Sequence, residues 1–537
     1  MTDPVNTCAA AAETSWPTED SELAKLFVPR EWPRSDESKR QRCCTILFDA
    51  SRKLLKVVDD ENSILDLINP ADIIGCELEI KLVDESNPSK ALASSKESEN
   101  PEAGTFDNTP KSLIPVDSHA KAFLTIYAYP KRDLSQSSTW LSWCGFGGTN
   151  NAPNPNPPST TGPFGNRQAR HRTFQVAPAE DLVHINALVR GIRQASGLPA
   201  RPRKLLVLVN PKSGTGTGQQ VLDQTVRPML VQAGVELEIC ETTHPLHAKE
   251  RATEEDIGSY DGVVLMGGDG IIHEFLQGVH AHRNADQLVH TIKLGVIGCG
   301  TGNGLAKSLT HAANEAYSHL ESTFLIAKSQ TTAMDLSKYE TSTQEYYSFL
   351  TFTWAMIADV DIESESVRFL GSLRFDLCAA WRVVSLRTYQ ARLSYLLPSK
   401  HDKSIDLGIA MPKLTDPVPN NWNVIDDTFI LFWASQVTHA SVNTFNSPPS
   451  TIGDGLFQIL VIRGKWSRYQ VALLLLALDA GTHVNSPAAE FIECVAYRLE
   501  PTTAGSFNDL DGEVIEAGPV QAHVLPKAIQ IFCHGDK

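Results

Sequence analysis

The chain has 537 residues, 42% of them hydrophobic, so we expect about two to four domains with cores of their own. The 47 basic and 63 acidic residues give a formal net charge of −16 at pH 7. This acidic excess argues against nucleic acid as a partner and provides no overall attraction to an anionic membrane. The ten cysteines lack CxxC and metal-ligand spacing, which predicts a reducing, cytoplasmic environment without a disulfide framework.

Neither a secretion signal nor a membrane span is predicted. Residues 1–40 are polar, with mixed charges and few clustered apolar side chains, and we expect them to be disordered. The apolar run from Val471 to Leu478 is far too short to cross a bilayer. We therefore expect membrane contact to be peripheral, from one side.

Residues 41–200 are predicted to form a β-rich accessory region. Apolar runs between turn residues indicate strands at 44–48, 53–58, 73–80, 122–128 and 172–176. The stretch 181–195 then places its apolar residues on one helical face. Strands closed by one amphipathic helix resemble a pleckstrin-homology module, and an unrelated β-rich accessory domain is the alternative.

Two stretches of this region are predicted to be flexible insertions. Residues 86–108 are rich in Ser, Lys and Glu, and residues 145–165 are dominated by Gly, Asn and Pro, so neither has a packing pattern. The adjacent Cys43 and Cys44 suit S-palmitoylation, but they also flank a predicted strand, where small buried cysteines are common. Both interpretations of this pair stay open.

The next region repeats one local pattern three times. Short apolar runs at 205–209, 262–266 and 294–297 predict buried parallel strands, and each is followed by a glycine-rich loop and a helical stretch. Loops of this kind gather at the carboxyl edge of a parallel sheet. Their backbone amides and the positive helix ends suit a polyphosphate.

The loops do not match the common nucleotide fingerprints, because Lys212 precedes the glycines and no GxxxxGK[ST] is present. They resemble the diacylglycerol-kinase catalytic family, whose fold is related to NAD kinases and phosphofructokinases, and within it the sphingosine kinases. The matching pieces are Asn210-Pro211 with the glycines, Thr242 with His247-Ala248, Gly267-Gly-Asp-Gly270 with His273-Glu274, and Gly300-Thr-Gly-Asn303. Animal sphingosine kinases usually carry serine at the position of Gly267, so this loop does not decide which lipid is used.

This resemblance implies ATP as the phosphate donor, and it implies by position a set of ATP-binding residues. They are Asn210, Pro211, Lys212, Ser213, Gly214, Thr242, Gly267, Gly268, Gly270, Glu274, Gly300, Thr301, Gly302, Asn303, Arg368, Arg374, Asp511, Gly512 and Glu513. Forked guanidinium donors suit the spread charge of phosphates, which agrees with the role implied for the two arginines.

The segment 357–365 combines apolar and acidic residues. A strand followed by a charged, solvated face is the simplest interpretation. With Arg368 and Arg374 downstream, however, the segment resembles the substrate region of sphingosine kinases, and by position Asp361 matches the carboxylate that meets the sphingoid amine. An ammonium bound beside an apolar tail needs such a fixed carboxylate.

The remaining chain is predicted to be β-rich with one helix. Strand patterns occur at 429–434, 455–463, 491–500 and 524–533. Residues 466–480 are helical and apolar around much of their circumference, as expected of a core helix or of the lining of a slot for an acyl-like tail. Asp511 and Glu513 again match the family, and they are candidates to hold Mg²⁺, although acidic surface turns have the same pattern.

We therefore predict an α/β plus β fold. A doubly wound, Rossmann-like nucleotide domain at 201–335, similar to NAD kinases and phosphofructokinases, is followed by an antiparallel β-sandwich lipid domain at 336–537. The β-rich accessory domain precedes both.

The predicted activity is a lipid kinase that moves the γ-phosphate of ATP, with Mg²⁺, to the primary hydroxyl of a sphingoid base. Asp269 is the predicted general base, because it lies at a strand end between two phosphate loops. A ceramide or diacylglycerol kinase shares every nucleotide loop, and a non-catalytic lipid-binding protein is the other alternative. The family leaves open whether the chain forms a homodimer.

Overall fold

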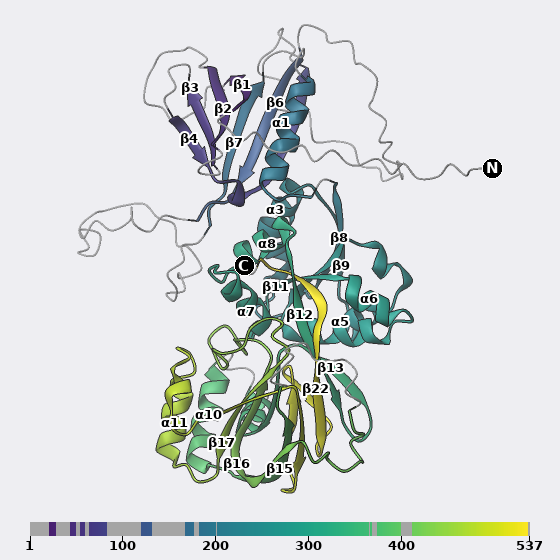
Figure 1. Ribbon diagram of the computed structural model, residues 1–537, viewed down its shortest axis with the longest axis vertical. Coiled ribbons are helices and arrows are strands. Elements are labelled where there is room, and N and C mark those ends of the chain that lie inside the picture. Colours follow the sequence, from purple (N-terminus) through teal and green to yellow (C-terminus); the bar gives the residue numbers. More distant parts are fainter. Residues whose placement is uncertain are drawn as a thin grey trace, which may run out of the picture. The chain divides into compact units, whose positions relative to one another are not determined.

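The computed structural model describes most of the chain from residue 201 onward and part of the region before it (Figure 1). The described residues are 21–27, 43–49, 54–59, 64–82, 120–131, 167–176, 182–199, 201–364, 366–367, 373–398 and 411–534. The chain divides into two compact units, residues 1–132 with 167–201, and residues 133–166 with 202–537.

The first unit is an antiparallel sheet with one helix. The strand order is β4-β3-β2-β1-β7-β6-β5. Its elements are β1 Ser21–Phe27, β2 Cys43–Asp49, β3 Leu54–Asp59, β4 Ile64–Ile68, η1 Pro70–Asp72, β5 Ile73–Leu82, β6 Ala120–Ala128, β7 Arg170–Val176 and α1 Leu182–Ala195. Apolar runs predicted β2, β3, β5, β6, β7 and α1, but not β1 and β4. Helix α1 packs on β5, where the Cys76 thiol lies 3.6 Å from the Val189 carbonyl oxygen.

One prediction for this unit is wrong. Residues 21–27 were expected to be disordered, but they form β1, which pairs with both β2 and β7. An isolated apolar pair such as Leu26-Phe27 gives a weak local signal, and pairing with strands distant in the chain supplies the rest. Residues 1–20 and 28–40 and both predicted insertions, 86–108 and 145–165, lie outside the described residues. The pleckstrin-homology interpretation stays a prediction.

The second unit begins with a parallel sheet in the order β9-β8-β10-β11. Its strands are β8 Arg203–Val209, β9 Val235–Glu241, β10 Gly262–Gly267 and β11 Lys293–Gly298. Five successive residues of β8, from Leu205 to Val209, are buried, as the continuous apolar run predicts for a strand covered on both faces. Figure 1 shows α5 and α6 on one side of these strands and α7 and α8 on the other.

Helical segments connect the parallel strands. They are α2 Gly218–Val221, the π-helical turn η5 Leu222–Val226, α3 Arg227–Gln232, α4 His247–Ala252, η6 Glu255–Ser259, α5 Asp269–Ala281, α6 Ala285–Thr291, α7 Gly304–Ala312 and α8 His319–Lys328. The helices begin directly after the glycine loops, so the loop amides and the helix amino ends lie at one edge of the sheet. The predicted doubly wound nucleotide fold is confirmed.

The rest of the unit is mainly antiparallel. Its elements are β12 Thr331–Glu340, β13 Glu345–Ser348, β14 Thr351–Ala355, α9 Met356–Ser364, α10 Leu373–Ser385, β15 Tyr389–Leu396, β16 Asn423–Ser435, β17 Phe457–Arg463, α11 Arg468–Leu476, η8 Thr482–Asn485, β18 Glu490–Cys494, β19 Ala496–Pro501, β20 Asn508–Leu510, β21 Glu513–Ile515 and β22 Val520–Phe532. Side chains from ten of these strands, many of them aromatic, form one core, as the predicted β layer requires.

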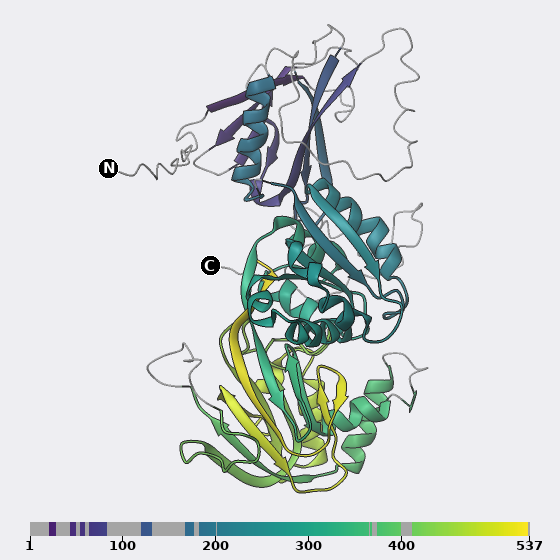
Figure 2. The ribbon, with the colours of Figure 1, turned by 90° about the vertical axis from the view of Figure 1, so that its right-hand side faces the viewer.

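The two halves of this unit share strands. β22 pairs antiparallel with β19 and β12 and then parallel with β11. One sheet therefore continues from the antiparallel strands of the predicted lipid domain, the lipid half, into the parallel strands of the predicted nucleotide domain, the nucleotide half. Figure 2 shows this strand, in yellow, running from the antiparallel half to the parallel strands. The boundary predicted between residues 335 and 336 falls inside β12, so the two predicted domains form one compact unit.

Candidate active site

Three glycine loops meet at the carboxyl edge of the parallel strands. A Cβ atom built on Gly300 would lie 2.3 Å from the Cα atom of Gly268, and one built on Gly214 would lie 2.4 Å from the Cys299 carbonyl oxygen. Both distances are far too short for any side chain, so glycine is required for the loops to touch. The loops after β8, β10 and β11 therefore form one continuous surface, as the sequence predicts.

Local hydrogen bonds shape the loop after β8. Oδ1 of Asn210 accepts the Lys212 amide at 3.1 Å, and the Ser213 amide donates to the Asn210 carbonyl oxygen at 3.2 Å. Gly214 and Gly216 adopt positive φ angles, which turn the loop before α2. At the neighbouring strand end, the Thr242 amide donates to the Val209 carbonyl oxygen at 2.8 Å. The predicted ATP-binding residues of this paragraph therefore lie along one stretch of the sheet edge: Asn210, Lys212, Ser213, Gly214 and Thr242.

Asp269 is the first residue of α5, and its carboxylate lies at the amino end of α7. Oδ2 accepts the Gly304 amide at 2.8 Å and Oδ1 accepts the Leu305 amide at 3.2 Å. A Cβ atom on Gly302 would lie 3.2 Å from Oδ2, so the loop passes directly beside the carboxylate. The pKa of Asp269 is raised to about 6: burial raises it most, the two amides lower it, and the charge of Asp511 raises it.

The Asn303 side chain stabilises its own loop, the one that follows β11, and does not face outward. Its side chain accepts the Gly300 amide at 2.8 Å and donates to the Gly300 carbonyl oxygen at 2.7 Å. It is buried and in the left-handed region, with φ of 58°. Asn tolerates this conformation better than most residues. Thr301 is exposed at the tip of the same loop.

The carboxylate of Asp511 joins four separate groups. Oδ1 accepts the Ser348 hydroxyl at 2.7 Å and the amides of Leu350 and Thr351 at 3.0 and 3.2 Å, and Oδ2 lies 3.0 Å from Nδ1 of His273. The side chain is fully buried. Both oxygens are therefore engaged in holding α5 to the β13–β14 corner, which the acidic-turn pattern did not predict.

Glu513 has a different environment. A Cβ atom on Gly270 would lie 3.1 Å from Oε1 of Glu513, so this carboxylate lies beside the residue that follows Asp269. Glu274 lies on the same helix, α5, and is half-buried. Among the residues that the structure describes, no group of three or more His, Cys, Asp and Glu side chains is arranged to hold a metal ion.

The segment that carries Asp361 is helical. It forms α9, whose Asp359 is buried and accepts the Tyr389 hydroxyl at 2.5 Å, with Arg382 of α10 at 3.7 Å. Arg382 also pairs with Glu363, so buried charges hold α9 to α10. Sequence analysis missed this network because its members are spread over three elements. Asp361 itself is half-buried.

One of the two arginines predicted to bind phosphate lies among the described residues. Arg374 on α10 is buried, and its guanidinium lies 4.5 Å from the centroid of the Phe375 ring. Arg368 lies outside the described residues.

Asp509 and Thr353 form a further polar pair that sequence analysis missed. Oδ2 of Asp509 accepts the Thr353 hydroxyl at 2.9 Å, and Asp509 is buried. Burial raises the pKa of Asp509 well above its usual value, and the charge of Asp361 raises it further. No local pattern predicted this pair, because Thr353 and Asp509 are 156 residues apart and meet only through the pairing of β14 with β20.

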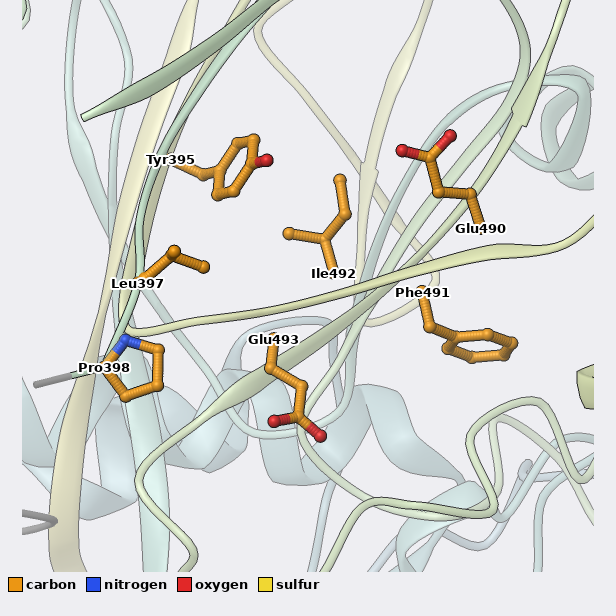
Figure 3. Close-up of a pocket in the computed structure, with 7 residues that line it drawn as sticks. All are labelled: Tyr395, Leu397, Pro398, Glu490, Phe491, Ile492 and Glu493. Carbon is orange, nitrogen blue, oxygen red and sulfur yellow. The ribbon is translucent and has the colours of Figure 1, made fainter. Parts of the chain in front are cut away.

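A hollow lies away from the glycine loops. It has a volume of about 460 Å³ and lies between the end of β15 and strand β18, lined by Tyr395, Leu397, Pro398, Glu490, Phe491, Ile492 and Glu493 (Figure 3). None of these residues belongs to the glycine loops, and Glu490 is already paired with Arg463 at 2.8 Å. A smaller hollow lies between α9 and α10 and is lined by Met356, Asp359, Arg382, Leu386 and Arg387.

The second unit combines glycine loops at the edge of a parallel sheet, an aspartate among these loops, and an antiparallel half. This combination defines a kinase of the diacylglycerol-kinase catalytic class. Residues 204–339 match the family model of the diacylglycerol kinase catalytic domain, and residues 444–533 match that of the YegS C-terminal NAD kinase beta sandwich-like domain. The first range contains Asp269 and the second contains Asp511 and Glu513. Asp361 lies between the two ranges.

Comparison with curated relatives identifies the family within this class to which the chain belongs. The chain is 32% identical over 348 residues to sphingosine kinase 1 of Rattus norvegicus, covering 62% of this chain and 91% of the relative. It is 31% identical over 356 residues to sphingosine kinase 1 of Arabidopsis thaliana, covering 62% of this chain and 72% of the relative. The chain belongs to the sphingosine kinase family.

Proposed function

We propose that the protein transfers the γ-phosphate of ATP to the primary hydroxyl of a sphingoid base, such as sphingosine, dihydrosphingosine or phytosphingosine, to give the 1-phosphate. The observation that carries this proposal is the Asp269 carboxylate, which two α7 amides hold where three glycine loops meet. Family membership supports ATP as the phosphate donor. The loop amides and the amino ends of α5 and α7 supply the positive potential that a triphosphate needs.

Asp269 is the proposed general base. The acceptor hydroxyl oxygen forms a bond to the γ-phosphorus, the bond from that phosphorus to the bridging oxygen of ADP breaks, and the hydroxyl proton passes to Asp269. A pKa of about 6 leaves the carboxylate ionised at pH 7 yet more basic than an ordinary aspartate. The Gly304 and Leu305 amides orient the carboxylate before the proton is transferred.

Mg²⁺ is the proposed counter-ion of the triphosphate, and Glu513 is the better of its two candidate ligands. Mg²⁺ in kinases keeps several waters and uses one or two carboxylates together with substrate phosphates, so a large protein cluster is not required. The Glu513 carboxylate beside Gly270 fits this requirement. The Asp511 carboxylate does not, because four donors already use its oxygens. When bound, the ion neutralises charge that develops on the phosphates.

Asp361 is the proposed partner of the substrate ammonium. It lies on α9, which follows β14 directly, and the apolar cluster that includes Met356, Trp433 and Leu474 lies alongside for a hydrocarbon tail. Ceramide and diacylglycerol have no free amine, so neither lipid could form an ion pair with Asp361. Arg374 and Arg368 stay proposed contacts of the ATP phosphates.

The substrate is a lipid, and we propose that α10 and α11 contact the membrane that contains it. Leu377, Trp381 and Val384 lie three and four residues apart on α10 and are exposed, Trp381 to 64%. Leu473 and Leu476 are exposed on α11, Leu476 to 81%. Nε of Arg468, at the start of α11, donates to the Val384 carbonyl oxygen at 2.8 Å, so the two helices are neighbours. Exposed apolar groups of this size favour an interfacial position in a bilayer.

We further propose that this contact is peripheral and occurs on the cytoplasmic side. The cysteines whose side chains the structure describes are free thiols, as expected of a reducing compartment: Cys76, Cys240, Cys299, Cys378, Cys494 and Cys533. As a separate finding, none of the helices in the described ranges combines the length and the apolar character that crossing a bilayer requires.

A kinase assay with labelled ATP tests the proposed reaction. Sphingosine, dihydrosphingosine and phytosphingosine should each accept label, whereas N-acylated sphingosine and diacylglycerol, presented in the same detergent micelles, should not. Equal labelling of sphingosine and its N-acylated form would contradict the role of Asp361 in selecting the amine. Labelling of diacylglycerol alone would overturn the proposed substrate class.

A further inference from the structure

A short polar row crosses the sheet next to the proposed substrate site. Strands β20, β14 and β16 are neighbours, and Asp509, Thr353 and Trp433 are register partners in that order. Register partners in an antiparallel sheet have Cβ atoms about 5 Å apart and lie on the same face. On this face Trp433 belongs to the apolar cluster that α9 and α11 cover. A carboxylate and a hydroxyl therefore lie beside an otherwise apolar surface.

Two atoms of this row lack hydrogen-bond partners within the described part of the chain. Oδ1 of Asp509 is buried and unpaired, although its Oδ2 accepts the Thr353 hydroxyl, and Nε1 of Trp433 is also buried and unpaired. Buried polar atoms are nearly always satisfied, because an unpaired one loses its hydration without compensation. The row thus offers one free acceptor and one free donor. A hydroxyl group can donate to the first and accept from the second.

The row adjoins the site on two sides. On one side, Asp511 follows Asp509 by two residues and contacts His273 of α5, the helix that begins with Asp269. On the other side, β14 runs directly into α9, where Ile357 and Asp361 are four residues apart and share a helix face. Ile357 packs against the cluster that contains Trp433, so this helix face is turned toward the row. The charge of Asp361 acts on the Asp509 carboxylate.

From this geometry we propose that Asp509 is a specificity-determining residue, whose Oδ1 accepts a hydrogen bond from a secondary hydroxyl of the sphingoid base. The inference rests on the proposed function. A sphingoid base carries its amine on the carbon next to the reacting one, and its secondary hydroxyls follow on the next one or two carbons. A site that places Asp269 at the primary hydroxyl and Asp361 at the amine has its next polar group at Asp509. Thr353 orients the carboxylate through Oδ2 and leaves Oδ1 for the substrate.

This arrangement predicts discrimination by hydroxylation. A site built to hydrogen-bond a hydroxyl rejects the analogue that lacks it, because its own polar atoms then stay buried and unpaired. Phytosphingosine has hydroxyls on carbons 3 and 4, dihydrosphingosine has only the one on carbon 3, and 3-deoxydihydrosphingosine has neither. The three bases share the amine and the primary hydroxyl, so they report on Asp509 and not on Asp361.

The test measures kcat/KM of the full chain for these three bases, with Asp509→Ala, the isosteric Asp509→Asn and Thr353→Val. Asp509→Ala should lower kcat/KM for a hydroxylated base about 5- to 10-fold, the scale of one lost hydrogen bond, and leave the 3-deoxy base nearly unchanged. Comparing phytosphingosine with dihydrosphingosine identifies the hydroxyl involved. Thr353→Val should act in the same direction more weakly. Asp509→Asn keeps an acceptor oxygen and should retain most of the preference. KM for ATP should not change.

The melting temperature provides an independent readout. Removing a buried carboxylate with an unpaired oxygen should leave the melting temperature of Asp509→Ala unchanged or raise it, whereas a purely structural residue would lower it. Equal losses for all three bases, or no loss for any, would overturn the assignment of Asp509. If the wild-type chain phosphorylates none of the bases, the proposed function itself fails. If it phosphorylates them and the variants do not discriminate, only this inference fails.

Discussion

Nδ1 of His273 lies 3.0 Å from Oδ2 of Asp511, 238 residues further along the chain. This contact joins the helix that begins with the proposed base to the turn that ends β20. Oδ1 of the same carboxylate accepts three more hydrogen bonds, from Ser348, Leu350 and Thr351. Asp511 therefore fixes the distance between the nucleotide half and the lipid half of the second unit.

Asp511→Ala should consequently destabilise the protein more than an ordinary surface substitution. The change leaves a buried hydroxyl, a histidine and two amides without their acceptor, and we expect a loss of about 3–5 kcal/mol in the free energy of unfolding. Urea unfolding measures it. Asp426→Ala is the matched control, because this carboxylate is on the surface of β16 and should change stability by less than about 0.5 kcal/mol. Similar stability of the two variants would remove Asp511 from this structural role.

Asp269→Asn should abolish most turnover while ATP still binds. Loss of a general base typically lowers kcat by about 10² or more. The two carboxylate oxygens accept different amides, and an asparagine keeps only one acceptor, so the free energy of unfolding should fall by about 1 kcal/mol. Single-turnover kinetics and ATP titration separate chemistry from binding. Turnover within a few-fold of wild type would contradict the assignment.

The pH profile should report the same carboxylate. Because burial raises the pKa of Asp269 to about 6, the base becomes protonated and kcat/KM should fall as pH decreases through about 6. The same titration affects the free energy of unfolding in the opposite direction. The folded state binds this proton more tightly than the unfolded state, so this group favours folding at low pH and that contribution is lost as pH rises from about 4 to about 6. An acidic limb that persists unchanged in the residual activity of Asp269→Asn would show that another group titrates.

Asp361→Asn should impair lipid binding and not ATP binding. Truncating one partner of a buried charged pair typically costs about 2–5 kcal/mol, so the apparent KM for sphingosine should rise at least about 30-fold and that for ATP should stay nearly constant. Arg374→Ala should have the opposite pattern if its guanidinium contacts the ATP phosphates. Titrating both substrates on each variant checks this. Equal changes in both KM values for Asp361→Asn would indicate a structural residue.

Trp381→Ser should weaken membrane binding without weakening chemistry. The indole is exposed on α10 beside Leu377 and Val384, so the substitution removes interfacial apolar area and disturbs no core packing. Co-sedimentation with phospholipid vesicles should decrease, and activity on sphingosine in detergent micelles should not. Val231→Ser on α3, where the side chain is 58% exposed, is the control and should sediment like wild type. Unchanged sedimentation of Trp381→Ser would place the membrane contact elsewhere.

The sequence alone determined the nucleotide half of the site. Short apolar strands, each followed at once by glycines, are local patterns, and parallel strands bring their following loops to one edge without further information. That is why Gly214, Gly268, Gly300 and Asp269 could be grouped before their contacts were known. Asp361 was found by resemblance to a family and not by a local physical signal, because a carboxylate in an acidic segment looks like any solvated face.

Only the tertiary structure decided what the acidic residues near the C-terminus do. Asp511 and Glu513 form one acidic turn in the sequence. In the structure Asp511 is buried and contacts four hydrogen-bonding groups, whereas Glu513 lies beside Gly270. The Asp509 carboxylate is oriented by a hydrogen bond from Thr353, which precedes it by 156 residues. Strand β1 likewise forms where local composition predicted disorder. The physical reason is common to all three cases: burial and hydrogen-bond partners are supplied by segments far away in the chain, and no local pattern records them.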